Sequence, residues 1–130
     1  MTQEHKELLL IDICARLPYK VKISIPELFT KKEQVETLNE VLKGKDNLYR
    51  VNDSGILIEY IKPYLFPLSS MTEEEKEEYC QLQQRIIYNS KRVVNEDIIK
   101  YINWCYKKHL DINNLITMKL AIDATGLNIY

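Results

Sequence analysis

With 130 residues the chain is long enough for one domain with its own core, because single domains usually hold about 100–150 residues. Apolar residues make up 45% and charged residues 28% of the chain, which excludes a disordered protein, and the net charge of −1 disfavours non-specific nucleic-acid binding. No stretch reaches the ~20 consecutive apolar residues of a membrane-spanning helix, and the N-terminus lacks a secretory signal pattern, so we expect a cytoplasmic protein.

A helix followed by a strand is predicted at the N-terminus. Apolar residues recur at three- and four-residue spacing through residues 3–17, with Thr2 in the N-cap position. Pro18 disfavours helical backbone in the residue before it, so we expect the helix to end there. Residues 19–25 switch to alternating apolar and polar side chains, which predicts a strand with one face in water that Pro26 ends.

The next segments favour short strands. Residues 34–43 fit both a helical and a strand period, and we favour a strand because the segments on both sides are extended. Residues 48–51 and 56–60 are rich in β-formers and flank four turn residues, 52–55, which predicts a hairpin. Together these segments predict a small, strongly bent antiparallel sheet, with an SH3-like barrel as a further possibility for its shape.

A proline-containing apolar segment follows the predicted sheet. Residues 62–68 carry two prolines among large apolar side chains, and proline is excluded from helix interiors and central strands. We therefore predict an extended connector that packs on the core. The single domain, residues 1–130, then has three parts, which are a helix with a sheet, a packed connector and a helical part (residues 1–62, 63–71 and 72–130).

The helical part begins with a strong helix signal. Thr72 and Glu75 have the spacing of a capping box, and the glutamates of the first turn suit the positive end of the helix dipole. We expect this helix to run to about Tyr88. Its predicted buried stripe consists of Tyr79, Leu82, Ile86 and Ile87.

A second helix is predicted to begin at Asn95, which we interpret as its N-cap. Its apolar face carries Ile98, Ile102, Cys105 and His109. A short third helix is predicted over residues 114–121, and residues 123–130 are predicted as an irregular tail that packs back onto the domain. The fold class is therefore α+β, with an N-terminal helix, a small sheet and a helical C-terminal half.

Cys105, His109 and Asp111 form the grouping closest to a reactive site. The first two lie four residues apart and share a helix face, and thiolate, imidazole and carboxylate all bind zinc. A metal- or thiol-dependent enzyme at these residues is therefore one alternative. We favour the structural interpretation, in which Cys105 packs in the core and His109 caps the helix end or pairs with Asp111. Cys14 and Cys80 belong to no CxxC pair, and we expect all three thiols to be free and buried.

The favoured function is a non-enzymatic binding or accessory module. Tyr64 and Phe66 of the connector form a candidate surface for another protein, with His109 and Asp111 as further candidate binding residues. A nucleic-acid-associated protein is the alternative, because basic residues and tyrosines gather near the sheet, although acidic residues interrupt the stretch. These basic residues are Lys20, Lys22, Lys31, Lys32, Lys43, Lys45 and Arg50. We expect no cofactor, no bound metal and no membrane partner.

Three segments carry a family resemblance: residues 14–19 (CARLPY), 62–74 (KPYLFPLSSMTEE) and 104–130. They resemble short uncharacterised proteins encoded by Bacteroides-type gut bacteria and their prophages, and the resemblance spans nearly the whole chain, with its weakest part at residues 26–58. It implies a cytoplasmic, phage-derived protein and no particular activity. Members of that family carry a second histidine and an aromatic-Arg-Gly step where this chain has Lys108 and residues 112–114. This departure weakens a catalytic role for His109 and Asp111.

Overall fold

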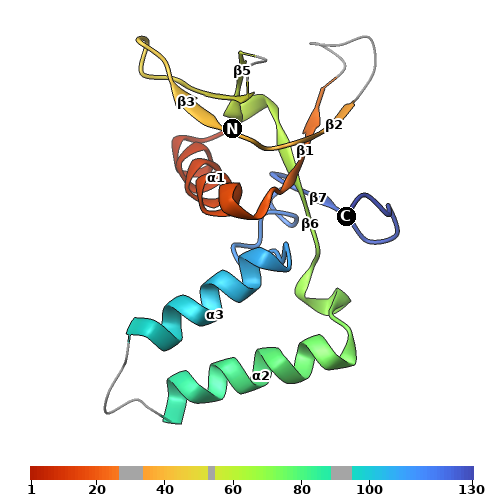
Figure 1. Ribbon diagram of the computed structural model, residues 1–130. Helices are drawn as coiled ribbons and strands as arrows, with labels where there is room; N and C mark the ends of the chain where they lie inside the picture. Colours follow the sequence, from red (N-terminus) through yellow and green to blue (C-terminus); the bar gives the residue numbers. More distant parts are fainter. Residues whose placement is uncertain (27–33, 53–54, 89–94) are drawn as a thin grey trace.

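The computed structural model (Figure 1) describes residues 1–26, 34–52, 55–88 and 95–130. Within these residues the predicted α+β order is confirmed, with a helix first, antiparallel-rich strands next and helices in the C-terminal half. The helices are α1 (Gln3–Arg16), α2 (Glu73–Tyr88) and α3 (Asn95–Lys107), with 3-10 turns η1 (Leu17–Tyr19), η4 (Ile58–Tyr60) and η5 (Leu68–Ser70). The strands are β1 (Lys22–Ile25), β2 (Gln34–Thr37), β3 (Val41–Lys43), β4 (Tyr49–Val51), β5 (Ile56–Leu57), β6 (Lys62–Leu65) and β7 (Ile122–Asp123).

Helix α1 begins at the predicted residue, ends one residue earlier than predicted, and has a different buried face. The Thr2 hydroxyl caps it by accepting a backbone N–H at 3.1 Å, and the helix ends before the proline-containing turn η1. Its buried residues are Leu9, Asp12, Ile13 and Arg16, so two charged side chains share the stripe that was predicted to be apolar. They can be buried because they pair with each other.

The core lies between α1 and the strands. Leu9 and Ile13 of α1 pack with apolar side chains from the strands and from the C-terminal segment, including Val21, Ile23, Val51, Ile61, Leu65, Leu115 and Leu120. Burial of these side chains is the main term that stabilises the fold. The C-terminal segment is therefore part of the core although it has little regular structure.

The described strands form two sheets, not one. The larger has the order β2-β1-β6-β7, antiparallel except for the parallel pair β6–β7, and the smaller has the order β3-β4-β5. This arrangement confirms the antiparallel-rich character, but these pairings close no SH3-like barrel among the described strands. Strand β1 lacks the predicted wet face, because Ile23, Ser24 and Ile25 are all buried.

Two predictions about short strands are confirmed. The ambiguous residues 34–43 contain β2 and β3, so the interpretation as strand is correct. Strands β4 and β5 pair through Val51 and Ile56 at the predicted hairpin, and Asn52 and Gly55 have the positive φ angles expected of a turn. The second strand is shorter than predicted, because residues 58–60 form the 3-10 turn η4. Residues 53–54 of that turn lie outside the described residues.

The first half of the connector, residues 62–65, is a central strand of the larger sheet. The prediction that its prolines exclude the connector from the sheet is therefore wrong for these residues. Strand β6 pairs with β1 through Lys62 and Pro63 and with β7 through Tyr64 and Leu65. The two pairings share no residue of β6, so Pro63 has a strand on one side only. Proline is tolerated there as it is on an edge strand, because no ladder bond is required on its other side.

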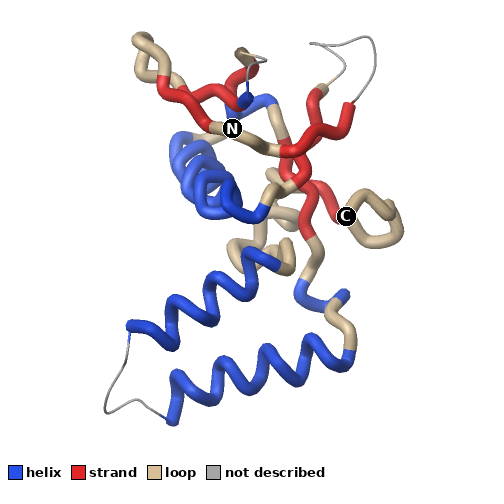
Figure 2. Tube along the Cα trace, in the orientation of Figure 1, coloured by secondary structure: helices blue, strands red, loops and turns tan. Residues whose placement is uncertain are grey.

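Helices α2 and α3 form a hairpin that extends away from the sheets (Figures 1 and 2). The capping box is present, because the Thr72 N–H donates to the Glu75 carboxylate at 3.0 Å and the Glu75 N–H to the Thr72 hydroxyl at 3.1 Å. The helix ends at Tyr88 as predicted. The predicted buried stripe is wrong, because all sixteen residues of α2 are described and none is buried. Helix α2 packs mainly on α3, and one neighbouring helix cannot enclose it.

The C-terminal segment folds as turns and not as the predicted third helix. Asn114 and Lys119 have φ angles of 59° and 62°, which are incompatible with a continuous α-helix over residues 114–121. The predicted packing of the tail is confirmed, because β7 joins the larger sheet and Tyr130 bonds to the backbone of β1 and β6.

Candidate functional site

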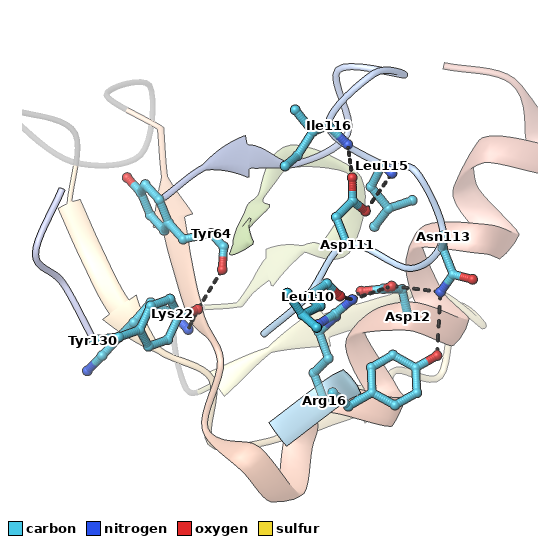
Figure 3. A network of polar contacts seen from close by, with 11 residues as sticks. Asp12, Arg16, Lys22, Tyr64, Leu110, Asp111, Asn113, Leu115, Ile116 and Tyr130 are labelled. Atoms are coloured by element: carbon cyan, nitrogen blue, oxygen red, sulfur yellow. Dashed lines mark hydrogen bonds and ion pairs between the residues drawn. The ribbon is translucent and has the colours of Figure 1, made fainter. Parts of the chain in front are cut away.

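A buried ion pair joins α1 to the C-terminal segment (Figure 3). The Arg16 guanidinium donates to the Asp12 carboxylate at 2.6 and 3.1 Å, and both side chains are fully buried. The same guanidinium donates to the Leu110 carbonyl at 2.7 Å and lies 4.8 Å from the ring centroid of Tyr106. The Nε and Nη2 atoms of Arg16 are therefore bonded to the chain's own groups, whereas its Nη1 atom is buried with no hydrogen-bond partner among the described residues; a cation–π contact adds to the stabilisation of the charge.

Two further polar side chains extend this network. The Asn113 amide donates to the Asp12 carboxylate at 2.8 Å. The Asp111 carboxylate accepts the backbone N–H of Leu115 at 2.7 Å and that of Ile116 at 2.9 Å, four and five residues later in the chain. Asp111, a predicted binding residue, thus holds the turn that follows it.

Asp12 and Arg16 are absent from the sequence predictions although the sequence contained a signal for them. They lie four residues apart, in register with Leu9 and Ile13 on one helix face. An acid and a base at this spacing usually pair on a wet surface, whereas this pair lies inside the apolar stripe. Two opposite charges within the core face of a predicted helix could therefore have indicated a buried pair.

His109 lies against Tyr130 and does not pair with Asp111. The His109 and Tyr130 rings stack with centroids 3.9 Å apart, and the His109 backbone has a φ of 57°. The Tyr130 hydroxyl donates to the Tyr64 carbonyl at 2.6 Å and accepts the Lys22 N–H at 2.9 Å (Figure 3). Burial raises the pKa of Tyr130 to about 12, so this hydroxyl keeps its proton at neutral pH.

The contacts of His109 and Asp111 do not bring these residues together with Cys105 as a metal or thiol site. Cys105 is fully buried, and burial raises the pKa of its thiol to about 11, which disfavours the reactive thiolate. Within the described parts of the chain, no three His, Cys, Asp or Glu residues lie together as metal ligands would. Cys14 and Cys80 are exposed, so the prediction of buried thiols is correct for Cys105 alone.

The two aromatic residues of the connector lie in different surroundings. Tyr64 is 5% exposed and belongs to the core, so it is not available as a contact surface. Phe66 is half-buried, with its ring 5.6 Å from that of Tyr130. Its N–H donates to the His109 carbonyl at 2.8 Å, and its carbonyl accepts the Asp111 N–H at 2.9 Å. These contacts attach the connector to the C-terminal segment.

The half-buried imidazole of His109 makes stability depend on pH. Burial first, and then the positive charges of Arg16 and Lys22, lowers the pKa of His109 from 6.5 to about 4. The unfolded chain therefore takes up a proton at a pH where the folded chain does not, so stability is lost as pH falls from about 6.5 to about 4. We expect the midpoint of urea denaturation to fall as the pH is lowered from about 6.5 to about 4. In the His109→Gln variant, the part of this fall that comes from the imidazole should be absent. An unchanged pH dependence in the variant would contradict this assignment.

Three of the seven basic residues predicted near the sheet have partners within the chain. Lys22 bonds to Thr37, Arg50 pairs with Asp46, and Lys43 lies over the ring of Tyr49. Lys31 and Lys32 lie outside the described residues. These contacts explain the three basic side chains as parts of the sheets, so they do not favour the nucleic-acid alternative.

A pocket of about 230 Å³ lies between α1 and the hairpin of β3 and β4. Leu9 and Tyr49 contribute to its wall, and an ion pair between Lys6 and Glu59, 2.8 Å long, lies at the same place. Small-molecule sites usually measure about 300–1,000 Å³, and the two charges here already satisfy each other. The pocket therefore favours no particular ligand.

The α2–α3 hairpin exposes large apolar side chains. Tyr88 and Ile87 are 82% and 66% exposed, the highest values among the large hydrophobic residues that are described, and Ile99 is 55% exposed. Between the helices, the Tyr101 hydroxyl donates to that of Tyr79 at 3.0 Å. The hairpin therefore has a satisfied inner contact but leaves three large apolar side chains exposed to water.

Among the residues that the structure describes, no helix combines the length and the apolar character needed to cross a membrane. Comparison of the chain with protein-family models, with curated proteins and with solved structures finds no match.

Proposed function

We propose that the chain is a non-enzymatic cytoplasmic module that binds another polypeptide through its α2–α3 hairpin. The observation that carries this proposal is a 16-residue helix without a buried residue, beside exposed Ile87, Tyr88 and Ile99. A phage-derived accessory protein, as the family resemblance implies, would need such a surface to act on a partner.

Helix energetics support this proposal. An isolated helix as short as α3, with 13 residues, is marginal in water, and helices in proteins gain most of their stability from packing an apolar face. Helix α2 packs that face mainly on α3. A partner that covered the remaining apolar surface would stabilise both helices.

The hairpin is anchored firmly at its base. Cys105 and Tyr106, near the end of α3, are buried, and the Tyr106 ring supports the Arg16 guanidinium. At the same end, the Trp104 indole donates to Glu78 of α2 at 2.8 Å. The body therefore fixes the direction of the hairpin, so a partner need not order it at its base.

Site-specific photocrosslinking in the organism that encodes the chain tests the proposal. A benzophenone amino acid replaces Tyr88 on the hairpin or Ile11, a 63% exposed residue of α1, as the control. We expect a discrete protein adduct from position 88 only, and its loss when Ile87→Glu and Ile99→Glu are added. Equal adducts from both positions, or none from either, would contradict the proposal. A nuclease-sensitive adduct would instead support the nucleic-acid alternative.

A further inference from the structure

We infer that the backbones of β1 and β6, with the rings of Phe66 and His109, form a binding site for a tyrosine side chain. The chain fills this site with its own Tyr130, and a tyrosine of another polypeptide can take its place. The ligand class is a para-substituted phenol. None of the groups that form the site belongs to α2 or α3, so this inference goes beyond the proposed function and does not rest on it.

The site lies where β6 changes its neighbouring strand. Strand β6 pairs with β1 through Lys62 and Pro63 and with β7 from Tyr64 onwards. Pro63 has no N–H, so its pairing with Ile23 is not of the kind that exchanges two hydrogen bonds. The two kinds of pair alternate along an antiparallel ladder, so the register predicts that the next pair, Lys22 opposite Tyr64, exchanges bonds.

A phenolic hydroxyl takes the place of a direct bond in that pair. The Tyr130 hydroxyl accepts the Lys22 N–H at 2.9 Å and donates to the Tyr64 carbonyl at 2.6 Å (Figure 3). The pairing of β1 with β6 accordingly stops one residue earlier. The hydroxyl therefore separates the two strands here and satisfies one backbone donor and one backbone acceptor, each of which needs a partner.

These two backbone groups select a hydroxyl. A single atom that both accepts and donates is required, whereas a carboxylate only accepts, an ammonium group only donates and a methyl group does neither. Burial raises the pKa of Tyr130 to about 12, so its hydroxyl keeps the proton that it donates to the Tyr64 carbonyl. The site therefore takes a neutral hydroxyl at neutral pH.

Two rings beside the hydroxyl select an aromatic ligand. The His109 ring stacks on the Tyr130 ring, with centroids 3.9 Å apart and an angle of 16° between the planes. The Phe66 ring lies 5.6 Å from the Tyr130 ring and is inclined to it by 50°. The hydroxyls of serine and threonine have no ring for these contacts. Hydrogen bonds and rings together therefore specify a phenol.

The occupant can be exchanged because the segment that carries it has few buried side chains. Residues 125–128 are all exposed, and Tyr130 itself is 44% exposed. Detachment of this segment therefore brings little apolar surface into water beyond the side chains of Ile129 and Tyr130. A tethered ligand competes at a roughly millimolar effective concentration, so the chain's own Tyr130 restrains binding of a tyrosine from another polypeptide.

Removal of the ring from the full chain, followed by addition of a phenol, tests the inference. In Tyr130→Ala, p-cresol, the side-chain analogue of tyrosine, should shift the Lys22 amide resonance in a saturable way in ¹H–¹⁵N spectra. 4-Methylanisole, which has a similar ring but an oxygen that cannot donate, should bind clearly more weakly. Tyr130→Phe, whose ring still fills the site, should show no saturable response to p-cresol.

Two further measurements test the walls of the site and the source of the phenol. Addition of His109→Ala to Tyr130→Ala should weaken p-cresol binding several-fold, because the stacked ring is lost. A peptide with the sequence of residues 125–130 should shift the same Lys22 resonance in Tyr130→Ala. The same peptide with phenylalanine in place of its tyrosine should not.

The outcomes that overturn the inference are distinct. No saturable shift with p-cresol would mean that β1 and β6 close the ladder without the phenol, and equal affinity for 4-methylanisole would mean that the hydroxyl is not recognised. Binding of p-cresol but not of the tyrosine peptide would overturn exchange with another polypeptide. If Tyr130→Ala does not fold alone, p-cresol should restore its folded circular dichroism and 4-methylanisole should not, because a ligand of the folded state stabilises it. Failure of p-cresol to restore the fold would then overturn the inference.

Discussion

Arg16→Ala is expected to lower the free energy of unfolding by about 3–5 kcal/mol, because it leaves the buried Asp12 carboxylate without its partner. The substitution also removes the donor to the Leu110 carbonyl and the cation above the Tyr106 ring. The loss should appear in urea denaturation as a lower midpoint at neutral pH, with the slope unchanged.

Two further variants show whether the loss of stability comes from the unpaired buried charge. Replacement of both charges, by Asp12→Leu with Arg16→Met, should be far less destabilising than either single change, because no unpaired charge remains. Arg50→Ala breaks the other four-residue-spaced Asp–Arg pair, with Asp46, which lies in water and should therefore matter little. If Arg16→Ala destabilised no more than Arg50→Ala, the buried pair would not hold the C-terminal segment to α1.

Local signals in the sequence predict the ends of the helices well. Thr2 and Thr72 cap the first two helices because the hydroxyl and the N–H that it accepts are only three residues apart. The hairpin of β4 and β5 is predictable for the same reason, because its strands are joined by a short turn. These features need no information from distant parts of the chain.

Contacts between distant residues explain most of the errors. Arg16 is buried because the Leu110 carbonyl, 94 residues later, accepts its N–H, and no local pattern indicates that partner. Pro63 can enter a central strand because β1 and β7 cover different parts of β6. By contrast, the error at residues 114–121 is local, because Asn114 and Lys119 have positive φ angles and Asp111 accepts the N–H groups of Leu115 and Ile116 in a series of turns.

The candidate surface shows the same limit of sequence reasoning. The apolar stripe of α2 was predicted as buried, since such stripes usually pack on the same chain. Whether the chain supplies enough neighbours depends on where α2 lies in the fold, and here it leaves the body with only α3 beside it. Conversely, the sequence predicts that Tyr64 contacts a partner, yet Tyr64 pairs with β7 and is only 5% exposed.

Tyr64→Ala is expected to destabilise the chain by about 3–5 kcal/mol, the usual loss when a large buried aromatic residue is truncated in a core. Phe66→Ala should cost clearly less, because Phe66 is half-buried and packs on the edge of the Tyr130 ring system. Urea denaturation of both variants, followed by far-ultraviolet circular dichroism, measures the difference. Equal and small losses would mean that Tyr64 adds little to the core, and the connector would again be a candidate binding surface. A large loss at Tyr64 alone would leave the α2–α3 hairpin as the surface on which the proposed function depends.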